Sequence, residues 1–183
     1  MTKRIGIIGS PGSGKSTCAA GVYSKLKLNG FSIELVQEAA RHQINMGWEY
    51  KLPSDQFRIL MHQRRYEDSI PESTDIIISD SPVLLTLFYA LWNTNDPENY
   101  TFTLSDLYFE FLKELKRYDL LVFLNRTKEY INDGTRIQSE VESNEISRLI
   151  KALLDLHHVK YLEMPGNENT TDYIVNWIRD ENI

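Results

Sequence analysis

The chain has 183 residues, of which 42% are hydrophobic and 25% are charged, and its formal net charge is −6. This length suits one domain, and the composition excludes disordered, collagen-like and fibrous chains. The negative charge argues against a protein that holds a long nucleic acid by neutralising phosphates alone, although it leaves room for a local basic patch. The single cysteine, Cys18, excludes an internal disulfide and a multi-cysteine zinc site, and it fits a reducing cytosol.

The amino-terminal apolar run, residues 5–8, is too short for a signal-peptide core or a membrane span. We therefore expect a cytoplasmic protein with no membrane partner. No segment repeats at a fixed period and none is low in complexity. Residues 1–183 are accordingly predicted to form one domain.

Five short apolar runs alternate with longer segments of helical spacing, a pattern typical of α/β proteins. Runs such as residues 76–78 and 120–123 contain no polar residue, as expected of strands that are buried on both faces of a parallel sheet. The predicted strands are residues 4–8, 33–37, 75–79, 120–124 and 159–162. The predicted helices are residues 15–29, 38–46, 54–69, 83–92, 104–117, 142–157 and 170–181. The sequence therefore predicts a three-layer α/β/α fold around a five-stranded parallel sheet.

Two polar stretches interrupt this alternation. Residues 93–103, which are rich in Asn, Asp, Thr and Pro, are predicted to form a surface loop. Residues 126–141 include Asp133-Gly134 and lack apolar periodicity. We expect them to form a mobile, lid-like segment between the fourth strand and the next helix.

The segment between the first strand and the first helix matches a phosphate-binding loop. Its residues Gly9-Ser10-Pro11-Gly12-Ser13-Gly14-Lys15-Ser16 fit the pattern G-x-x-x-x-G-K-[ST], and Thr17 follows. In such a loop the backbone N–H groups face phosphate oxygens, the Lys15 ammonium reaches the outer phosphates, and the Ser16 hydroxyl ligates Mg²⁺. A preceding strand and a following helix are the context that the pattern requires. We therefore predict that residues 9–17 bind ATP with Mg²⁺, the alternative being a chance turn rich in Gly and Ser.

Acidic residues follow the second and third predicted strands. Asp80 would lie at the same sheet edge as the loop, where a carboxylate holds water on Mg²⁺; its alternative role is to cap the next helix. Glu38 shares a helix face with Arg41, three residues further on. Glu38 could accept the proton of an acceptor hydroxyl while Arg41 orients the acceptor, and an exposed ion pair is the alternative.

Two sets of basic residues lie outside the loop. Arg126 and Arg136 belong to the lid-like segment, where arginines that close over the phosphates would neutralise charge and exclude water. A basic loop that only keeps the surface solvated is the alternative. Arg58, His62 and Arg65 form one stripe of a predicted helix, which either contacts an anionic substrate or a base or is a solvated face.

The order of these parts resembles the small P-loop kinases of nucleosides, nucleotides and related metabolites, over nearly the whole chain. Residues 36–41, Val-Gln-Glu-Ala-Ala-Arg, look like the Glu-x-Ala-Arg segment of ribosylnicotinamide kinases and related phage P-loop kinases. Residues 130–136 are similar to the Asp-Gly-x-Arg segment of their lids. The resemblance implies transfer of the γ-phosphoryl group of ATP to a hydroxyl of a nucleoside-, nucleotide- or nicotinamide-riboside-like acceptor, with adenine near the lid and residues 165–167. The residues expected to act on the reacting groups are Lys15, Glu38, Arg41, Arg126 and Arg136.

Other functions stay open at this stage. Deoxynucleoside kinases usually carry Asp-Arg-Ser or Glu-Arg-Ser where this chain has Asp80-Ser81-Pro82, so their arginine contact to the substrate has no counterpart. Some phage members of the wider family phosphorylate a hydroxymethylated base within DNA, an acceptor that the negative charge disfavours and the basic stripe keeps open. The remaining alternative is an ATPase or nucleotide switch that acts on a macromolecular partner, although the chain lacks the Asn-Lys-x-Asp signature of GTPases. The sequence leaves the oligomeric state open.

Overall fold

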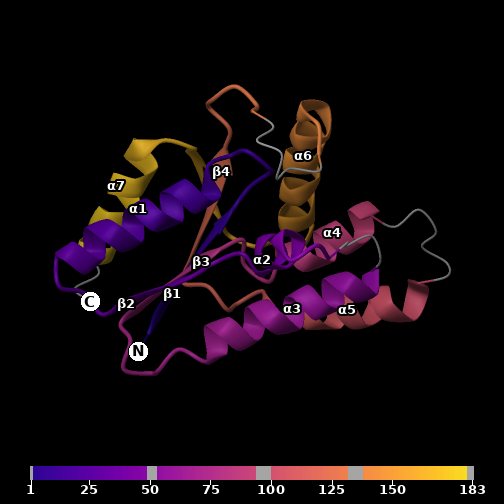
Figure 1. The fold of residues 1–183 in the computed structure, drawn as a ribbon, viewed down its shortest axis with the longest axis horizontal. Coiled ribbons are helices and arrows are strands. Elements are labelled where there is room, and N and C mark those ends of the chain that lie inside the picture. Colours follow the sequence, from indigo (N-terminus) through magenta and orange to yellow (C-terminus); the bar gives the residue numbers. More distant parts are fainter. Residues whose placement is uncertain (1, 49–52, 94–99, 132–137, 181–183) are drawn as a thin grey trace.

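A parallel sheet forms the framework of the chain (Figure 1). The computed structural model describes residues 2–48, 53–93, 100–131 and 138–180. The strands are β1 (Lys3–Ile8), β2 (Ile33–Val36), β3 (Ile76–Asp80), β4 (Leu120–Asn125) and β5 (Leu162–Pro165). They form one five-stranded sheet in the order β2-β3-β1-β4-β5, and every pair is parallel. The α/β fold with a five-stranded parallel sheet that the sequence predicts is confirmed.

Helices cover both faces of this sheet. They are α1 (Lys15–Leu28), α2 (Ala39–Asn45), α3 (Pro53–Asp68), α4 (Leu85–Asn93), α5 (Thr101–Glu114), α6 (Glu140–Leu156) and α7 (Glu168–Asp180). Helices α1 and α7 lie side by side on one face, and α3, α4, α5 and α6 pack on the other (Figure 1). In the described parts of the chain, none of the helices combines the length and apolar character needed to cross a membrane.

Side chains alternate between the two faces of the sheet along each strand. This alternation divides the core into two layers and decides on which face each polar residue near the site lies. Ile5 and Ile7 of β1 pack with α1 and α7, whereas Ile8 packs with the opposite layer. Because successive side chains of a strand point to opposite faces, the same alternation in β3 puts Asp80 on the α1 side and Ser79 on the α3 side. The carboxyl ends of the strands meet at one edge, where the loop after β1 begins.

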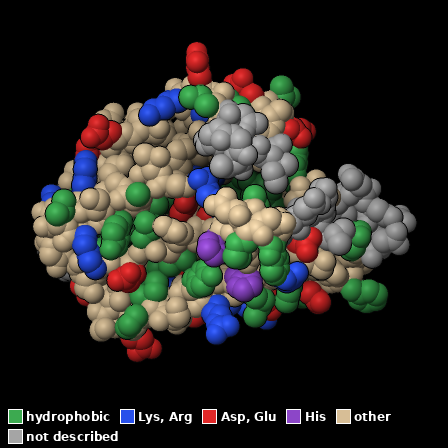
Figure 2. All heavy atoms as spheres, viewed as in Figure 1, with side chains coloured by type: hydrophobic (Ala, Val, Ile, Leu, Met, Phe, Trp, Pro, Cys, Tyr) green, Lys and Arg blue, Asp and Glu red, His purple; other side chains and the backbone are tan. Residues whose placement is uncertain are grey.

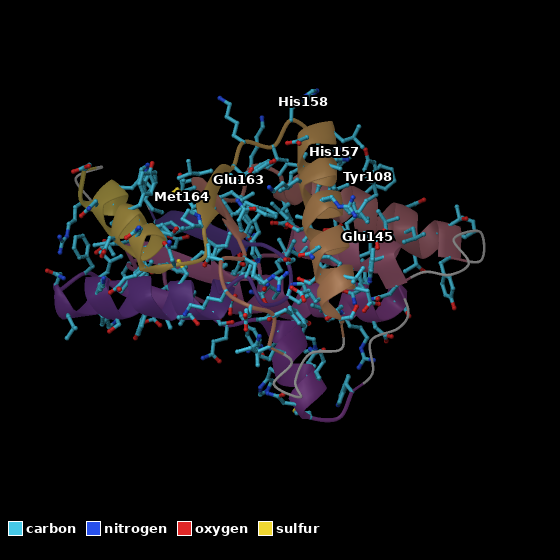
Figure 3. The ribbon with its side chains drawn as sticks, turned by 90° about the horizontal axis from the view of Figure 1, so that it is seen from above. Tyr108, Glu145, His157, His158, Glu163 and Met164 are labelled. Carbon is cyan, nitrogen blue, oxygen red and sulfur yellow. The ribbon has the colours of Figure 1, made fainter. Side chains whose placement is uncertain are left out.

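Both ends of α6 are held by side chains. At its start, the Ser139 hydroxyl accepts from the Glu142 N–H (3.3 Å), and the Glu142 carboxylate accepts from the Ser139 N–H (2.7 Å). At its end, the His157 ring packs against the rings of Tyr108 and Phe111 on α5, with ring centres 5.5 and 5.1 Å apart (Figure 3). These contacts orient α6, which supports the loop after β1.

The fifth strand begins later than predicted, at Leu162 instead of residue 159. His158 has a φ of 53°, and its N–H donates to the Asp155 carbonyl oxygen (3.0 Å). The Val159 N–H donates to the Leu154 carbonyl oxygen (2.9 Å), so these residues end α6. Val159 is apolar because it packs against the core layer under α6, not because it belongs to the sheet.

The predicted loop at 93–103 is shorter than expected at its carboxyl end. Helix α5 begins at Thr101, so the last residues of that stretch are helical. Residues 94–99 lie outside the described residues.

Candidate active site

The loop between β1 and α1 has backbone angles that favour glycine. Gly9, Gly12 and Gly14 have φ values of 151°, 79° and 93°. A Cβ at Gly9 would lie 2.6 Å from the Ser13 Oγ and 2.7 Å from the Leu124 carbonyl oxygen. Gly14 occupies the N-cap of α1, whose first backbone N–H groups have no partner within the helix. The loop and the positive end of α1 therefore form a site suited to phosphate.

Lys15 and the buried serines fix the shape of this loop. The Lys15 ammonium donates to the carbonyl oxygens of Gly9 (3.1 Å) and Ser10 (3.2 Å). From α6, the buried Ser143 hydroxyl donates to the Pro11 carbonyl oxygen (2.7 Å) and lies 3.2 Å from the Ser10 Oγ. Ser143 was not predicted from the sequence, where its signal is a serine at a core-facing position of an amphipathic helix.

Asp80 has the position and the surroundings of a metal-binding carboxylate. It pairs in register with Ile7 of β1, and the residue is only 5% exposed. Its Oδ1 is buried without a hydrogen-bond partner among the described residues, which costs free energy unless a bound group supplies one. Helix α4 begins at Leu85, too far along the chain for Asp80 to cap it. Oxygen ligands suit Mg²⁺, so Ser16 and Asp80 fit the pair that would hold it.

Glu38 occupies the N-cap of α2, and its side chain is 23% exposed. Burial raises its pKa; the Lys15 ammonium lowers it, and the Asp80 carboxylate raises it. Because Lys15 and Asp80 both act on the pKa of Glu38, the three side chains lie within electrostatic range of one another at one edge of the sheet. The Arg41 Nε lies 3.6 Å from the Glu38 Oε2, and the Arg41 side chain is half exposed. The ion pair considered from the sequence therefore forms within the site.

A small cavity of about 30 Å³ lies beside Glu38, between α2, α3 and the segment from Ser81 to Tyr89. The Gln63 Oε1 of α3 accepts from the Ala39 N–H (2.9 Å), which fixes the amide, while its buried Nε2 has no partner among the described residues. The Ser81 side chain lines the same cavity and lowers the pKa of Glu38 by hydrogen bonding to its carboxylate. The unpartnered Gln63 Nε2 is therefore the polar group of this cavity that is available to a ligand.

The tyrosine of this cavity is a hydrogen-bond donor. Burial and the charge of Glu38 raise the pKa of Tyr89, so its hydroxyl keeps its proton. Gln63, Ser81 and Tyr89 were not predicted as site residues from the sequence. A signal for Gln63 exists: it stands four residues after the buried Ile59 and thus on the core face of α3, where a polar residue is unusual.

A larger cavity of about 480 Å³ lies between the loop, residues 127–129 and residues 166–168. Gly166 packs directly on the loop, because a Cβ there would lie 2.0 Å from the Ser13 carbonyl oxygen. The Thr127 hydroxyl donates to the Gly166 carbonyl oxygen (3.1 Å) and joins the segments that follow β4 and β5. The volume is that of a small-molecule site.

Of the two arginines predicted for the lid, Arg126 lies among the described residues and Arg136 does not. Arg126 donates to the Glu140 carboxylate (2.8 Å) and to the Asn144 Oδ1 (2.8 Å), so in this structure it is tied to α6. Arg126 and Ser10 of the loop both line a polar cavity of about 600 Å³. Arg136, with the rest of the Asp133-Gly134-x-Arg136 segment, lies outside the described residues.

The basic stripe of α3 faces outward. Arg58, His62 and Arg65 line a surface groove with Met61, and the Arg58 guanidinium stacks 4.4 Å from the ring centre of Trp48. Figure 2 shows histidine and hydrophobic side chains gathered over α2 and α3. The structure therefore separates this groove from the cavity beside Glu38, which the opposite face of α3 lines.

Family and structure comparisons agree on the class of this protein. A family model described as an AAA domain matches residues 4–170, so the chain belongs to this family of P-loop proteins. No curated protein matches the chain.

Solved kinases share the fold. The NadR protein in complex with NR has a TM-score of 0.75 and 18% identity, over 98% of this chain and 51% of NadR. The chain thus spans about half the length of NadR. Thymidylate kinase from Candida albicans has a TM-score of 0.65 and 17% identity, over 98% of this chain and 90% of its own. Deoxyadenosine kinase from M. mycoides with bound dCTP has a TM-score of 0.61 and 18% identity, over 97% and 99%. The predicted resemblance to P-loop nucleoside and nucleotide kinases is confirmed at the level of the fold.

Proposed function

We propose that this protein transfers the γ-phosphoryl group of ATP to a hydroxyl of a small nucleoside-, nucleotide- or nicotinamide-riboside-like acceptor. The observation that carries the proposal is that Glu38 lies within electrostatic range of Lys15 and Asp80, beside a cavity that exposes the unpartnered Gln63 Nε2. The fold shared with NadR, thymidylate kinase and deoxyadenosine kinase supports it.

The chemistry needs little beyond positioning and charge. The Glu38 carboxylate accepts the proton of the acceptor hydroxyl while that oxygen bonds to the γ-phosphorus. The bond from the γ-phosphorus to the oxygen that bridges the β- and γ-phosphates breaks, and this oxygen leaves with ADP. Mg²⁺, when held by Ser16 and Asp80, would neutralise the phosphate oxygens.

Basic residues would stabilise the charge that develops during transfer. Lys15 and the N–H groups of the loop lie where the phosphates would bind. Arg41 orients the acceptor beside Glu38, and Arg126 and Arg136 close over the phosphates. For Arg126 this requires exchange of its bonds to α6 for bonds to the nucleotide.

The two cavities suggest where each substrate binds. The cavity beside Glu38 has room for about two water molecules, so only the hydroxyl-bearing end of an acceptor enters it in this conformation. There the Gln63 Nε2 would donate to a polar atom of the acceptor. The adenine of ATP would occupy the larger cavity between residues 127–129 and residues 166–168.

One observation favours a second candidate, a hydroxymethylated base within DNA as acceptor. The groove with Arg58, His62 and Arg65 combines positive charge with apolar and aromatic surface, as nucleic-acid sites do. The groove lies on the outer face of α3, and the opposite face of the same helix lines the cavity beside Glu38.

The deciding experiment incubates the protein with γ-labelled ATP, Mg²⁺ and a panel of acceptors. The panel contains nucleosides, nucleoside monophosphates, nicotinamide riboside and DNA with a hydroxymethylated base. We expect label on a small acceptor and a loss of at least about 100-fold in the rate for Lys15→Ala. Lys27→Ala is the matched control, because Lys27 is half exposed near the end of the same helix and pairs with Glu34.

The other results of the labelling experiment would point to other functions. Label on DNA alone would replace the small acceptor by the second candidate. Release of label only as free phosphate would indicate an ATPase or switch with a macromolecular partner. Undiminished transfer by folded Lys15→Ala would contradict the kinase mechanism.

A further inference from the structure

The buried face of α3 carries a carboxylate that the proposed chemistry does not use. Glu67 is fully buried. Its carboxylate accepts from the Ser79 Oγ (2.8 Å), the Tyr118 hydroxyl (3.0 Å) and the Arg117 Nε (2.6 Å). A carboxylate without solvent is very costly unless it is both paired and hydrogen-bonded, and Glu67 is both. The three donors come from β3 and from the segment before β4.

These hydrogen bonds hold the two ends of the turn that contains Asp80. Ser79 directly precedes Asp80 in β3. The Tyr118 hydroxyl, which donates to the carboxylate of Glu67, accepts in turn from the Val83 N–H (3.2 Å), three residues after Asp80. Between these two anchors Ser81 has a φ of 60°, an uncommon backbone conformation for a residue other than glycine.

Packing leaves this turn little room to relax. A Cβ at Gly6 of β1 would lie 3.1 Å from the Pro82 Cγ and 3.2 Å from the Tyr118 Cδ1. Pro82 and Tyr118 therefore pack closely against the same stretch of β1 backbone. The hydrogen bonds and this packing together determine the direction of the turn.

Arg117 supplies positive charge to the network. Its guanidinium pairs with Glu67 on one side and with Glu114 (3.1 Å) and Asp68 on the other. Burial opposes the charge of Arg117, but the neighbouring carboxylates raise its pKa above the ordinary value. The guanidinium therefore stays charged, and the Arg4 Nη1 adds a second positive charge 3.8 Å from the Glu67 Oε2.

We propose that Glu67 is a positioning residue for Asp80. Through Ser79 and Tyr118 it holds both ends of the turn that presents the Asp80 carboxylate to Mg²⁺. The positioning role of Glu67 rests on the binding of Mg²⁺ by Asp80, which is part of the proposed function. Glu67 shares α3 with Gln63, so the same contacts also set the place of Asp80 relative to the cavity beside Glu38.

The test is the Mg²⁺ dependence of nucleotide binding, measured without turnover. Tyr118→Phe removes one hydroxyl and keeps the ring against Gly6 of β1, and Ser79→Ala removes the other anchor. With a fluorescent, non-hydrolysable ATP analogue, we expect both variants to need about 10-fold more Mg²⁺ for half-maximal binding. Their affinity for the analogue in excess chelator should equal that of the wild type.

Tyr161→Phe is the matched control. It also removes a tyrosine hydroxyl that bonds to a carboxylate, that of Asp155 (3.0 Å), away from the turn. We expect this variant to have the wild-type Mg²⁺ requirement. Thermal unfolding of each variant shows which are folded, and Ser79→Ala carries the test if Tyr118→Phe does not fold.

Three results would overturn the proposal. One is an unchanged Mg²⁺ requirement in the folded variants. Another is an equal loss of affinity with and without Mg²⁺, which would indicate general support of the nucleotide site. If the wild type itself binds the analogue without any response to Mg²⁺, the metal role of Asp80 in the proposed function is wrong, and the role of Glu67 fails with it.

Discussion

The surroundings of Glu38 act on both its chemistry and the stability of the fold. Burial raises its pKa above the ordinary value, so the folded protein binds this proton more tightly than the unfolded chain does. Between the ordinary value and the folded value, unfolding releases a proton. The free energy of unfolding therefore falls as pH rises through this window. A general base with a raised pKa removes a proton more readily, so the same shift that favours transfer costs stability at higher pH.

Replacement of Glu38 by Gln should separate these two effects. We expect kcat to fall about 100- to 10,000-fold with little change in affinity for ATP, because only the proton acceptor is lost. At pH values above the pKa of Glu38 in the folded protein, the free energy of unfolding measured in urea should be higher for the variant than for the wild type. This advantage should shrink as pH falls toward 4.5, the ordinary value.

The matched control for this prediction is Glu34→Gln. Glu34 is half exposed on β2 and pairs with Lys27 away from the loop. Its replacement should leave kcat and the pH dependence of unfolding nearly unchanged. If Glu38→Gln keeps the wild-type kcat, Glu38 is only the partner of Arg41.

At the scale of elements, the end of β5 serves as a support for the phosphate-binding loop. The Gly166 N–H donates to the Asn125 carbonyl oxygen (2.7 Å), which aligns the ends of β4 and β5. The absence of a side chain at Gly166 lets this segment touch the loop at Ser13. A strand that does not carry a catalytic residue thus determines the position of the loop.

Gly166→Ala should disturb this contact. Its Cβ would meet two carbonyl oxygens, at 2.0 Å on Ser13 and 3.0 Å on Asn125, and backbone cannot move away as a side chain can. We expect a loss of about 1–3 kcal/mol in the free energy of unfolding and weaker nucleotide binding. Denaturant unfolding and titration with an ATP analogue measure the two effects.

Gly30→Ala, just after α1, is the control for this substitution. Its Cβ would meet no atom within 4 Å, but its φ of 84° disfavours alanine, so the variant should lose stability without touching the loop. If both variants lose the same stability and affinity, the contact of Gly166 with the loop has no special importance.

Helix α3 carries polar side chains on both its exposed face and its buried face. Its outer face carries Arg58, His62 and Arg65, while its buried face carries Gln63 and Glu67. Buried polar groups require partners with defined geometry, so they orient a helix more strictly than apolar packing alone. The buried face thus links the cavity beside Glu38 to the turn of Asp80.

At the scale of the whole molecule, nucleotide binding should couple to global stability. The proposed ligands come from the loop after β1, the start of α1 and the end of β3, which lie in the centre of the sheet. A ligand that binds only the folded state stabilises it according to its concentration relative to Kd. Elements of both core layers contact these segments, so the gain should appear in the single unfolding transition.

We expect Mg²⁺ and ATP at about 100 times Kd to raise Tm by about 5–10 °C. A scan of thermal unfolding with and without the nucleotide measures this shift. Lys15→Ala should lose most of it while its own Tm without nucleotide stays near that of the wild type, because the Lys15 ammonium donates to carbonyl oxygens of the loop and not to a core element. A shift of full size in the variant would mean that the nucleotide binds elsewhere.

The sequence by itself determined the fold class and the phosphate-binding loop. The loop could be predicted because its groups lie within eight consecutive residues between a strand and a helix, and this local order fixes their geometry. The buried runs at 76–78 and 120–123 likewise indicated a parallel sheet, because both faces of such strands are covered. Asp80 and Glu38 could be selected because parallel strands end at one edge. The fifth strand was misplaced because Val159, at the end of α6, has the same apolar character as a strand residue.

Only the tertiary structure decided how distant residues complete the site. Gln63 lies 24 residues from Ala39, Tyr118 lies 51 residues from Glu67, and Ser143 lies 133 residues from Ser10. Such contacts depend on the rotation and depth of each helix against the sheet, which follow from packing of the entire core. Sequence spacing relates residues within one element, and it does not specify which faces of separate elements meet. The loop is therefore a property of a short segment, whereas the cavity beside Glu38 and the support of Asp80 are properties of the folded chain.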